Sequence, residues 1–157
     1  MVRNWQEIDW TDEDELVSEN FTVRDAVWLP QWGRLAEHAD GFGARTKMRL
    51  QNFLLDHADA VVELLGAKPP VHSCYRPKLY NALPAIGGAP GSAHVVLGNW
   101  AALDFGAADV AACDAARELL AANAEALGIR VEDRPGSNWV HFDSKPISPG
   151  GSRYFKP

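Results

Sequence analysis

Two histidines and one aspartate stand out as residues that could share a metal ion. His94 closes a glycine-rich stretch, Asp104 lies near the end of a short apolar run, and His141 lies in an alternating segment near the C-terminus. Imidazole nitrogens and a carboxylate oxygen are common ligands of a catalytic zinc ion, which keeps a fourth position open for water. The three residues are therefore candidate zinc ligands, provided that the fold brings them together.

Residue type and spacing alone leave other interpretations open. His94 could be an ordinary loop histidine, Asp104 could cap the turn before Gly106, and His141 could be a half-buried histidine with a structural partner. The spacing is not that of a compact motif such as H-E-x-x-H. In favour of a metal, a carboxylate at the end of a buried strand is costly unless it is paired or bound to a cation.

The segment around His141 has the pattern of a strand with one polar face. Side chains alternate between the two faces of a strand, so Trp139, His141 and Asp143 share one face, while Val140 and Phe142 share the other. The polar face can therefore point into a site while the apolar face packs in the core.

Hydrophobic spacing and stop signals predict the helices that support these residues. Residues 45–65 carry apolar side chains at helical spacing, and Gly66 ends that stretch. Residues 110–127 form an alanine-rich helical stretch that Gly128 ends. Thr22, followed three residues later by an aspartate, predicts the start of a short helix.

Four short runs predict strands: Val71–Tyr75, Ala101–Phe105, Ile129–Glu132 and Trp139–Asp143. Residues 76–93 hold so many prolines and glycines that we expect a loop with no regular element. The order of helices, strand, loop, strand, helix and two strands predicts an α+β fold, with a small antiparallel sheet flanked by helices.

The length of 157 residues indicates one domain that can bury a core without disulfides. We expect residues 1–17 to form a loosely attached N-terminal arm and residues 18–157 to form the single domain. Cys74 and Cys113 lack the CxxC spacing of a zinc site, so we expect two reduced, partly buried thiols.

Composition bears on the partners of the chain. A net charge of -6 and the lack of a basic run disfavour a nucleic-acid partner. No run approaches the roughly 18 apolar residues that span a membrane, so no membrane partner is expected. The N-terminal residues lack the basic-then-apolar order of a secretory signal, which predicts a cytoplasmic or phage-associated protein. The oligomeric state is left open.

The stretch from Ser92 to Asp104 resembles the SxHxxGxAxD signature of the zinc D-Ala-D-Ala carboxypeptidase family. The matching residues are Ser92, His94, Gly98, Ala102 and Asp104. Further segments agree in the same order along the chain. The strand Trp139–Asp143 resembles the part that carries the third ligand, and residues 73–77 are similar to the SGYR segment.

The opening Ser18–Phe21 resembles the subgroup that includes bacterial murein endopeptidases and phage-encoded members. Altogether the resemblance covers residues 18–146. It implies a zinc metallopeptidase fold, of the hedgehog and D-Ala-D-Ala peptidase type, for residues 18–157. It also implies a peptidase that acts on peptidoglycan peptides containing D-amino acids, with Zn²⁺ as cofactor.

The resemblance also implies roles for individual residues. His94, Asp104 and His141 would be the zinc ligands. Arg76 would stabilise the oxyanion or grip a substrate carboxylate, a task that suits a fixed guanidinium group. Ser92 would help to bind substrate or orient the loop of His94. Trp139 is a candidate wall of the substrate cleft, as is Trp100, although tryptophans at such positions are often part of the core.

The chain departs from the family pattern at three places. The step from His94 to Asp104 is ten residues, longer than usual, and Cys74 stands where the family has glycine. Many members carry a proton acceptor just before the last histidine, where this chain has Asn138, Trp139 and Val140. None of these three side chains can accept a proton at neutral pH.

Other carboxylates could take the place of the missing proton acceptor. Asp143 is the nearest substitute, and it could equally orient His141 through the second ring nitrogen. Glu132 and Asp133 are weaker candidates. Three hypotheses follow: a peptidase of cell-wall peptides, a zinc-holding structural or binding domain such as a phage virion component, and a hydrolase of another amide bond.

Overall fold

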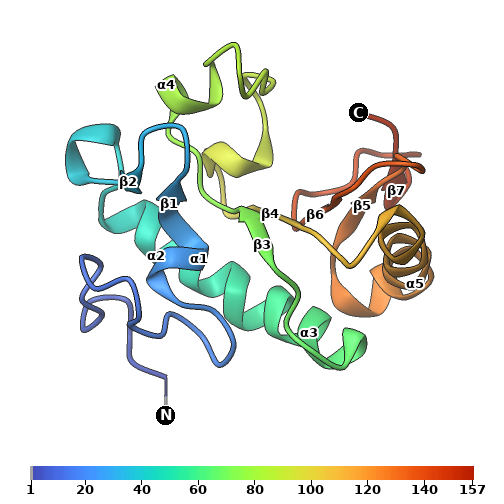
Figure 1. Ribbon diagram of the computed structural model, residues 1–157, viewed down its shortest axis with the longest axis horizontal. Coiled ribbons are helices and arrows are strands. Elements are labelled where there is room, and N and C mark those ends of the chain that lie inside the picture. The colour runs from blue at the N-terminus through green and yellow to red at the C-terminus, as the bar shows by residue number, and fades with distance from the viewer. Residues whose placement is uncertain (1) are drawn as a thin grey trace.

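The strands form one five-stranded sheet and a separate two-stranded ribbon in the computed structural model, which describes residues 2–157 (Figure 1). The sheet order is β3-β4-β6-β5-β7. Its strands are β3 (Val71–Ser73), β4 (Ala102–Phe105), β6 (Val140–Asp143), β5 (Arg130–Glu132) and β7 (Tyr154–Phe155). The ribbon pairs β1 (Trp28–Leu29) with β2 (Arg34–Leu35).

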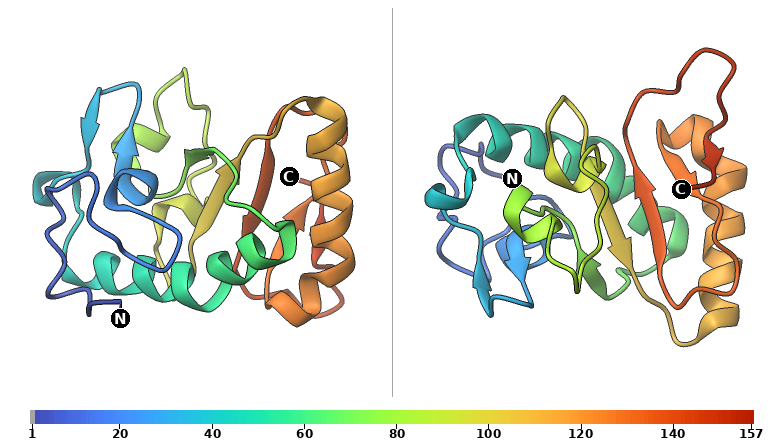
Figure 2. Two further views of the ribbon diagram at one scale, coloured as in Figure 1. Left: turned by 60° about the horizontal axis from the view of Figure 1, so that its bottom comes forward. Right: turned by 90° about the horizontal axis from the view of Figure 1, so that it is seen from above.

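The helices lie mainly on one face of this sheet (Figure 2). A long helical rod consists of α2 (Ala44–Phe53), a π-helical turn (Leu54–Ala58) and α3 (Asp59–Leu65). The other long helix is α5 (Val110–Leu127), which packs on β5 and β6. Short elements complete the chain: α1 (Val23–Val27), α4 (Lys78–Asn81), and 3-10 turns at His38–Asp40 and Ala93–Val95.

Strand register places the polar residues of β4 and β6 in matching rows. Antiparallel pairing sets Asp104 opposite His141 and sets Ala102 opposite Asp143. On the other side of β4, Ser73 of β3 is the partner of Asp104. Because facing residues in paired strands lie about 4.5–5.5 Å apart, this register alone makes Asp104 and His141 neighbours.

The apolar face of the sheet forms the core beneath these residues. Val140 and Phe142 are fully buried, as the alternating pattern of this strand predicts. The ring of Phe142 lies 5.7 Å from Phe53 of α2 and 6.3 Å from Phe105 of β4, measured between ring centroids. The rod and the sheet are therefore joined directly under the strand that carries His141.

The predicted helices are confirmed, and their ends are where the stop signals place them. The rod spans the predicted residues 45–65 and ends at Gly66, which has a φ of 79°. Helix α5 ends at Gly128, with a φ of 65°. In this left-handed region glycine avoids the strain of a Cβ atom. Thr22 caps α1 through a reciprocal capping box with Asp25.

The predicted α+β fold, with a small antiparallel sheet flanked by helices, is confirmed, and the structure differs from the prediction in two details. Residues 76–93 were expected to lack regular structure, but Lys78–Asn81 form one helical turn, α4. Pro77 precedes this turn, and a proline there costs no helical hydrogen bond. The sheet is also not purely antiparallel, because β7 adds to β5 in parallel from the glycine-rich C-terminal segment.

Residues 2–17 are attached more firmly than the expected arm. Ile8, Trp10 and Val17 are buried in the same core as the sheet. The side-chain amide of Gln51, on α2, donates to the backbone carbonyls of Arg3 and Val17. The aromatic and aliphatic side chains of this segment thus complete the core. Within residues 2–157, no helix has the length and apolar character needed to cross a bilayer.

A buried carboxylate on α3 holds the chain that leads into the domain. Asp59 is 7% exposed. It accepts hydrogen bonds from the hydroxyl of Ser18, the backbone N–H of Glu19, and the backbone and side-chain N–H groups of Asn20. A carboxylate that replaces several water contacts in this way fixes the turn before α1 on the rod.

We expect Asp59→Ala to lower the free energy of unfolding by about 2–4 kcal/mol, because it leaves the buried hydroxyl of Ser18 and three partly buried N–H groups without an acceptor. Urea denaturation followed by tryptophan fluorescence measures this difference. Asp56→Ala is the matched control, since Asp56 is exposed in the same rod, and it should change stability by less than about 0.5 kcal/mol. Equal stability of the two variants would remove Asp59 as an anchor.

Candidate metal centre

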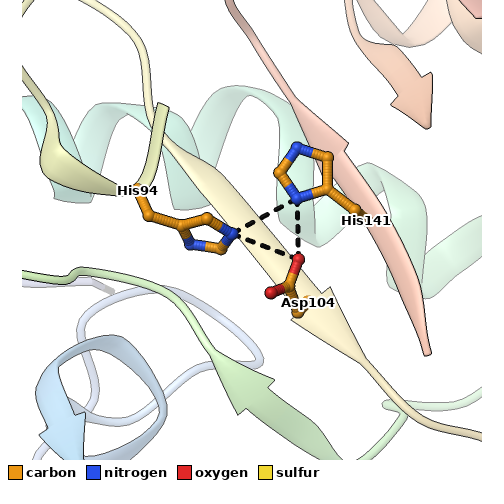
Figure 3. A group of neighbouring side chains, drawn as sticks. All are labelled: His94, Asp104 and His141. Atoms are coloured by element: carbon orange, nitrogen blue, oxygen red, sulfur yellow. Dashed lines mark hydrogen bonds and ion pairs between the residues drawn. The ribbon is translucent and has the colours of Figure 1, made fainter. Parts of the chain in front are cut away.

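The structure brings the three predicted ligands together at one point (Figure 3). His94 comes from the 3-10 turn Ala93–Val95, Asp104 from β4 and His141 from β6. Asp104 Oδ1 lies 3.1 Å from His94 Nε2 and 2.7 Å from His141 Nδ1. The two ring nitrogens are 3.2 Å apart. Three donor atoms, distant along the chain, therefore point to a common centre.

These distances suit a zinc ion. With zinc–ligand distances of about 2.0–2.1 Å, neighbouring ligands of a tetrahedral site lie roughly 3.3 Å apart. Two of the three spacings agree within a few tenths of an ångström, and the third is short because His141 and Asp104 share a hydrogen bond. The residues present therefore fit the metal that this ligand set favours, and the fourth corner remains for water or substrate.

Hydrogen bonds on the outer side of each ring prepare both histidines for metal binding. His94 Nδ1 donates to the carbonyl oxygen of Cys74 at 2.6 Å. His141 Nε2 lies 3.2 Å from Oδ2 of Asp143. A ring nitrogen that donates outward carries the proton of the neutral imidazole, so the other nitrogen offers its lone pair to the centre.

Burial and charge give the three groups of the metal-free cluster different protonation states. Burial lowers the pKa of His94. Burial opposes ionisation of Asp104, but the two histidines hold the pKa of its carboxyl well below the usual range. Burial also opposes a charge on His141, yet hydrogen bonds and charges from Asp104 and Asp143 raise its pKa to about 10. At neutral pH and without a bound metal, these shifts make His141 a cationic imidazolium, His94 a neutral imidazole and Asp104 a carboxylate.

Two roles are predicted for Asp143, accepting a proton or orienting His141. Its contacts favour the orienting role. Asp143 is 1% exposed, and its two oxygens accept from Nε and Nη2 of Arg130, each at 2.8 Å. The backbone N–H of Lys145 also donates to it. The ring of Phe155 covers the Arg130 guanidinium at 4.2 Å. A carboxylate held in this way fixes the ring of His141 from behind.

Arg76 acts on the ligand aspartate from the opposite side. Its Nη2 donates to Asp104 Oδ2 at 2.6 Å, and its Nε donates to the hydroxyl of Ser73. Its backbone N–H donates to the carbonyl of His94. Arg76 therefore occupies the second oxygen of Asp104 and leaves Oδ1 for the metal, while it holds the strand end against the loop of His94.

A cleft of about 550 Å³ opens over this cluster. Ser92 and Trp139, predicted to contact substrate, both line it, whereas Trp100 does not. Four cationic side chains also line the cleft: Arg76, Arg130, Arg134 and Lys145. Three carboxylates, those of Asp104, Glu132 and Asp143, line it as well, so the lining lacks the negative excess of the whole chain, whose net charge is -6.

The longer step between His94 and Asp104 does not separate the two ligands. Val96 adopts a left-handed conformation with a φ of 57° and ends the 3-10 turn that carries His94. Arg49 of α2 then donates to the side chain of Asn99 at 3.0 Å and to the carbonyl of Leu97 at 3.3 Å. The extra residues form a loop that is tied to α2, outside the cleft lining.

Three contributors to the site were not predicted from the sequence. The carbonyl of Cys74 orients His94, and Arg130 and Phe155 support Asp143. Arg130 could have been found by pairing the predicted strands, because the register sets it opposite Asp143. The position of the Cys74 carbonyl and that of the Phe155 ring, in a two-residue strand, have no comparable signal in the sequence.

A buried His–Asp–His cluster beneath an open cleft is the arrangement of a mononuclear catalytic zinc site. A family model described as Peptidase M15 matches residues 33–143, which include all three cluster residues. The chain belongs to this family of zinc-dependent metallopeptidases. The α+β architecture agrees with the fold of this family. No curated protein and no solved structure gives a significant match.

We expect His141→Ala to abolish zinc retention, because it removes one of three ligands. Asp143→Asn should keep a weaker site, with an affinity for zinc about 10–100-fold lower, because it disturbs only the outer partner of His141. Elemental analysis and competition with a chelating dye measure both effects. Zinc retention by His141→Ala at the wild-type level would contradict the ligand set.

Zinc binding should release about one proton at neutral pH. The raised pKa of His141 means that the metal-free ring is protonated at pH 7, whereas His94 is already neutral and Asp104 already ionised. The apparent zinc affinity should therefore rise with pH until the pH approaches 10. Calorimetry in buffers with different ionisation enthalpies counts the protons. Zinc binding without proton release would contradict this assignment.

Proposed function

We propose that this peptidase hydrolyses peptidoglycan peptides that contain D-amino acids, either as a carboxypeptidase or as an endopeptidase. The observation that carries the proposal is the His–Asp–His cluster at the base of a cleft that four cationic side chains help to line. A bound zinc ion would supply Lewis acidity there, making water nucleophilic near neutral pH and polarising the scissile carbonyl. The side chains around the cleft would position the peptide.

The cationic lining supports a substrate with carboxylates near the scissile bond. Peptidoglycan stem peptides are rich in free carboxylates, in contrast to most internal protein segments. Lys145 donates to the carbonyl of Gly91 across the cleft and has no carboxylate partner among residues 2–157. An ammonium group in this position is suited to an anionic substrate.

Arg76 has the position to act on the reacting carbonyl. Its side chain is 15% exposed, and only one of its terminal nitrogens bonds Asp104. The remaining N–H groups are available to stabilise negative charge on the carbonyl oxygen or to grip a substrate carboxylate. Ser92 accepts from the backbone N–H of His94, which supports its role in orienting that loop, and Trp139 would form one wall.

A second candidate function follows from the residues that precede His141. Asn138, Trp139 and Val140 cannot act as proton acceptors, so the site could hold zinc without turnover. In that case the chain would be a zinc-binding structural or recognition domain, for example a component of a phage particle. Intact zinc with no product from any wall peptide would favour this alternative.

We expect the zinc-loaded protein to release peptides from purified sacculi and to cleave D-amino-acid-containing stem peptides, with loss of activity in chelator and recovery on adding zinc. Mass spectrometry of the products identifies the bond. A third outcome, cleavage of other amides but of no wall peptide, would show a hydrolase with a different substrate.

Arg76→Lys tests the catalytic part of the proposal. We expect kcat/KM to fall roughly 10²-fold, because a lysine cannot reproduce the geometry of the guanidinium donors. Zinc content is measured in parallel, since Arg76 also holds Asp104. Arg45→Lys, an exposed change on α2, is the matched control and should be neutral. Unchanged kcat/KM in Arg76→Lys would remove Arg76 from the mechanism.

A further inference from the structure

The cleft contains three carboxylates, and two of them are fully engaged. Asp104 faces both histidines with one oxygen and Arg76 with the other. Asp143 holds Arg130 with both oxygens and lies behind His141, on the nitrogen that points away from the centre. Neither has an oxygen free to take a proton from a water molecule in the cleft.

The third carboxylate, Glu132 on β5, is different. It lines the same cleft and is 8% exposed. Within residues 2–157 its carboxylate has a single polar contact, with Nη1 of Arg134 at 3.4 Å. The side chain of Arg134 is 52% exposed, so this contact is weak and solvent-accessible. Glu132 is thus the carboxylate of the cleft whose oxygens remain available.

The register of the sheet places Glu132 next to the metal cluster. Val131 is the partner of Phe142, so one step further along both strands sets Glu132 beside His141. The row that crosses the sheet then reads Ser73, Asp104, His141 and Glu132, one residue from each of four adjacent strands. These side chains project from the same face of the sheet, and all four line the cleft.

Two further titratable side chains lie near the cleft and fit the task less well. His72 also lines the cleft, at the position of β3 between Val71 and Ser73 where the register with β4 shifts. It is exposed, and its ring lies over Gly106. Asp133 is adjacent to Glu132 and points to the other face, and it does not line the cleft.

We propose that Glu132 is the proton acceptor of the hydrolytic reaction, in place of the residue that is missing before His141. This inference rests on the proposed function. The carboxylate of Glu132 takes one proton from the attacking water, and the water oxygen forms a bond to the scissile carbonyl carbon. Glu132 then passes the proton to the leaving amine nitrogen as the C–N bond breaks, so one water molecule is consumed and the carboxylate is regenerated.

Glu132→Gln tests this role, because it keeps the shape of the side chain and removes its basicity. We expect kcat on a cleaved wall peptide to fall 10²–10⁴-fold with little change in KM and with normal zinc content. Glu132→Asp should recover part of kcat. Asp133→Asn and His72→Gln are the matched controls, and both should keep kcat within a few-fold of the unmodified chain.

A second measurement does not need turnover. Acetohydroxamic acid must give up a proton when it binds a catalytic zinc site, and a nearby carboxylate can accept it. Calorimetric titration of the zinc-loaded proteins should show binding at least tenfold weaker in Glu132→Gln than in the unmodified chain or in Asp133→Asn. A chain that cleaves no peptide but shows this difference would refute the proposed function while supporting the role of Glu132.

Three results would overturn the inference. The first is a Glu132→Gln variant with kcat and acetohydroxamate affinity equal to those of the unmodified chain. The second is an equal loss of zinc from Glu132→Gln and Glu132→Asp, which would show a structural role. The third is a loss of kcat in His72→Gln that matches the expected loss in Glu132→Gln, because the proton acceptor would then be His72.

Discussion

The pairing of β4 with β6 is the constraint on which the site depends. Asp104 lies between Leu103 and Phe105 in a strand that is buried throughout, so its charge needs compensation inside the protein. The register that places it opposite His141 supplies this compensation. A shift of one residue would turn the polar face of β6 into the core and bring Val140 or Phe142 to the cleft. The hydrophobic pattern that builds the core therefore also sets the position of the ligands.

Each of the three candidate ligands is held by a partner on its outer side, and these partners come from different parts of the chain. The carbonyl of Cys74 fixes His94, Asp143 fixes His141, and Arg76 fixes Asp104. Such outer contacts orient the donor atoms before a metal arrives, which reduces the conformational entropy lost on binding. They also explain why cysteine is tolerated where the family has glycine. The contact is made by the backbone carbonyl, and the buried side chain packs in the core.

Sequence patterns predicted those features that depend on local signals. Hydrophobic periodicity predicted the helix at residues 110–127 and the two faces of Trp139–Asp143. The glycine after residue 127 predicted where that helix ends. The single turn Lys78–Asn81 was missed because the prolines and glycines around it signal a loop. A helical turn of only four residues can still form there, because it needs little helix propensity. Strand β7 was missed for a different reason. A two-residue strand has no periodicity, and it forms because β5 offers a free edge.

The three candidate ligands and the groups behind them form a continuous set of polar contacts. The ring of His141 lies between the carboxylates of Asp104 and Asp143, which raise its pKa to about 10, and the proton on its inner nitrogen balances the charge of Asp104 at the point where a cation would bind. A divalent ion and this proton are therefore alternative solutions to one electrostatic problem, the burial of a carboxylate next to two imidazoles. The donor atoms of the three side chains lie 2.7–3.2 Å apart, in positions set by the register of β4 with β6 and by the 3-10 turn that carries His94. A metal that binds here would take the place of the proton on the inner nitrogen of His141, so protons and zinc should compete for the same donor atoms.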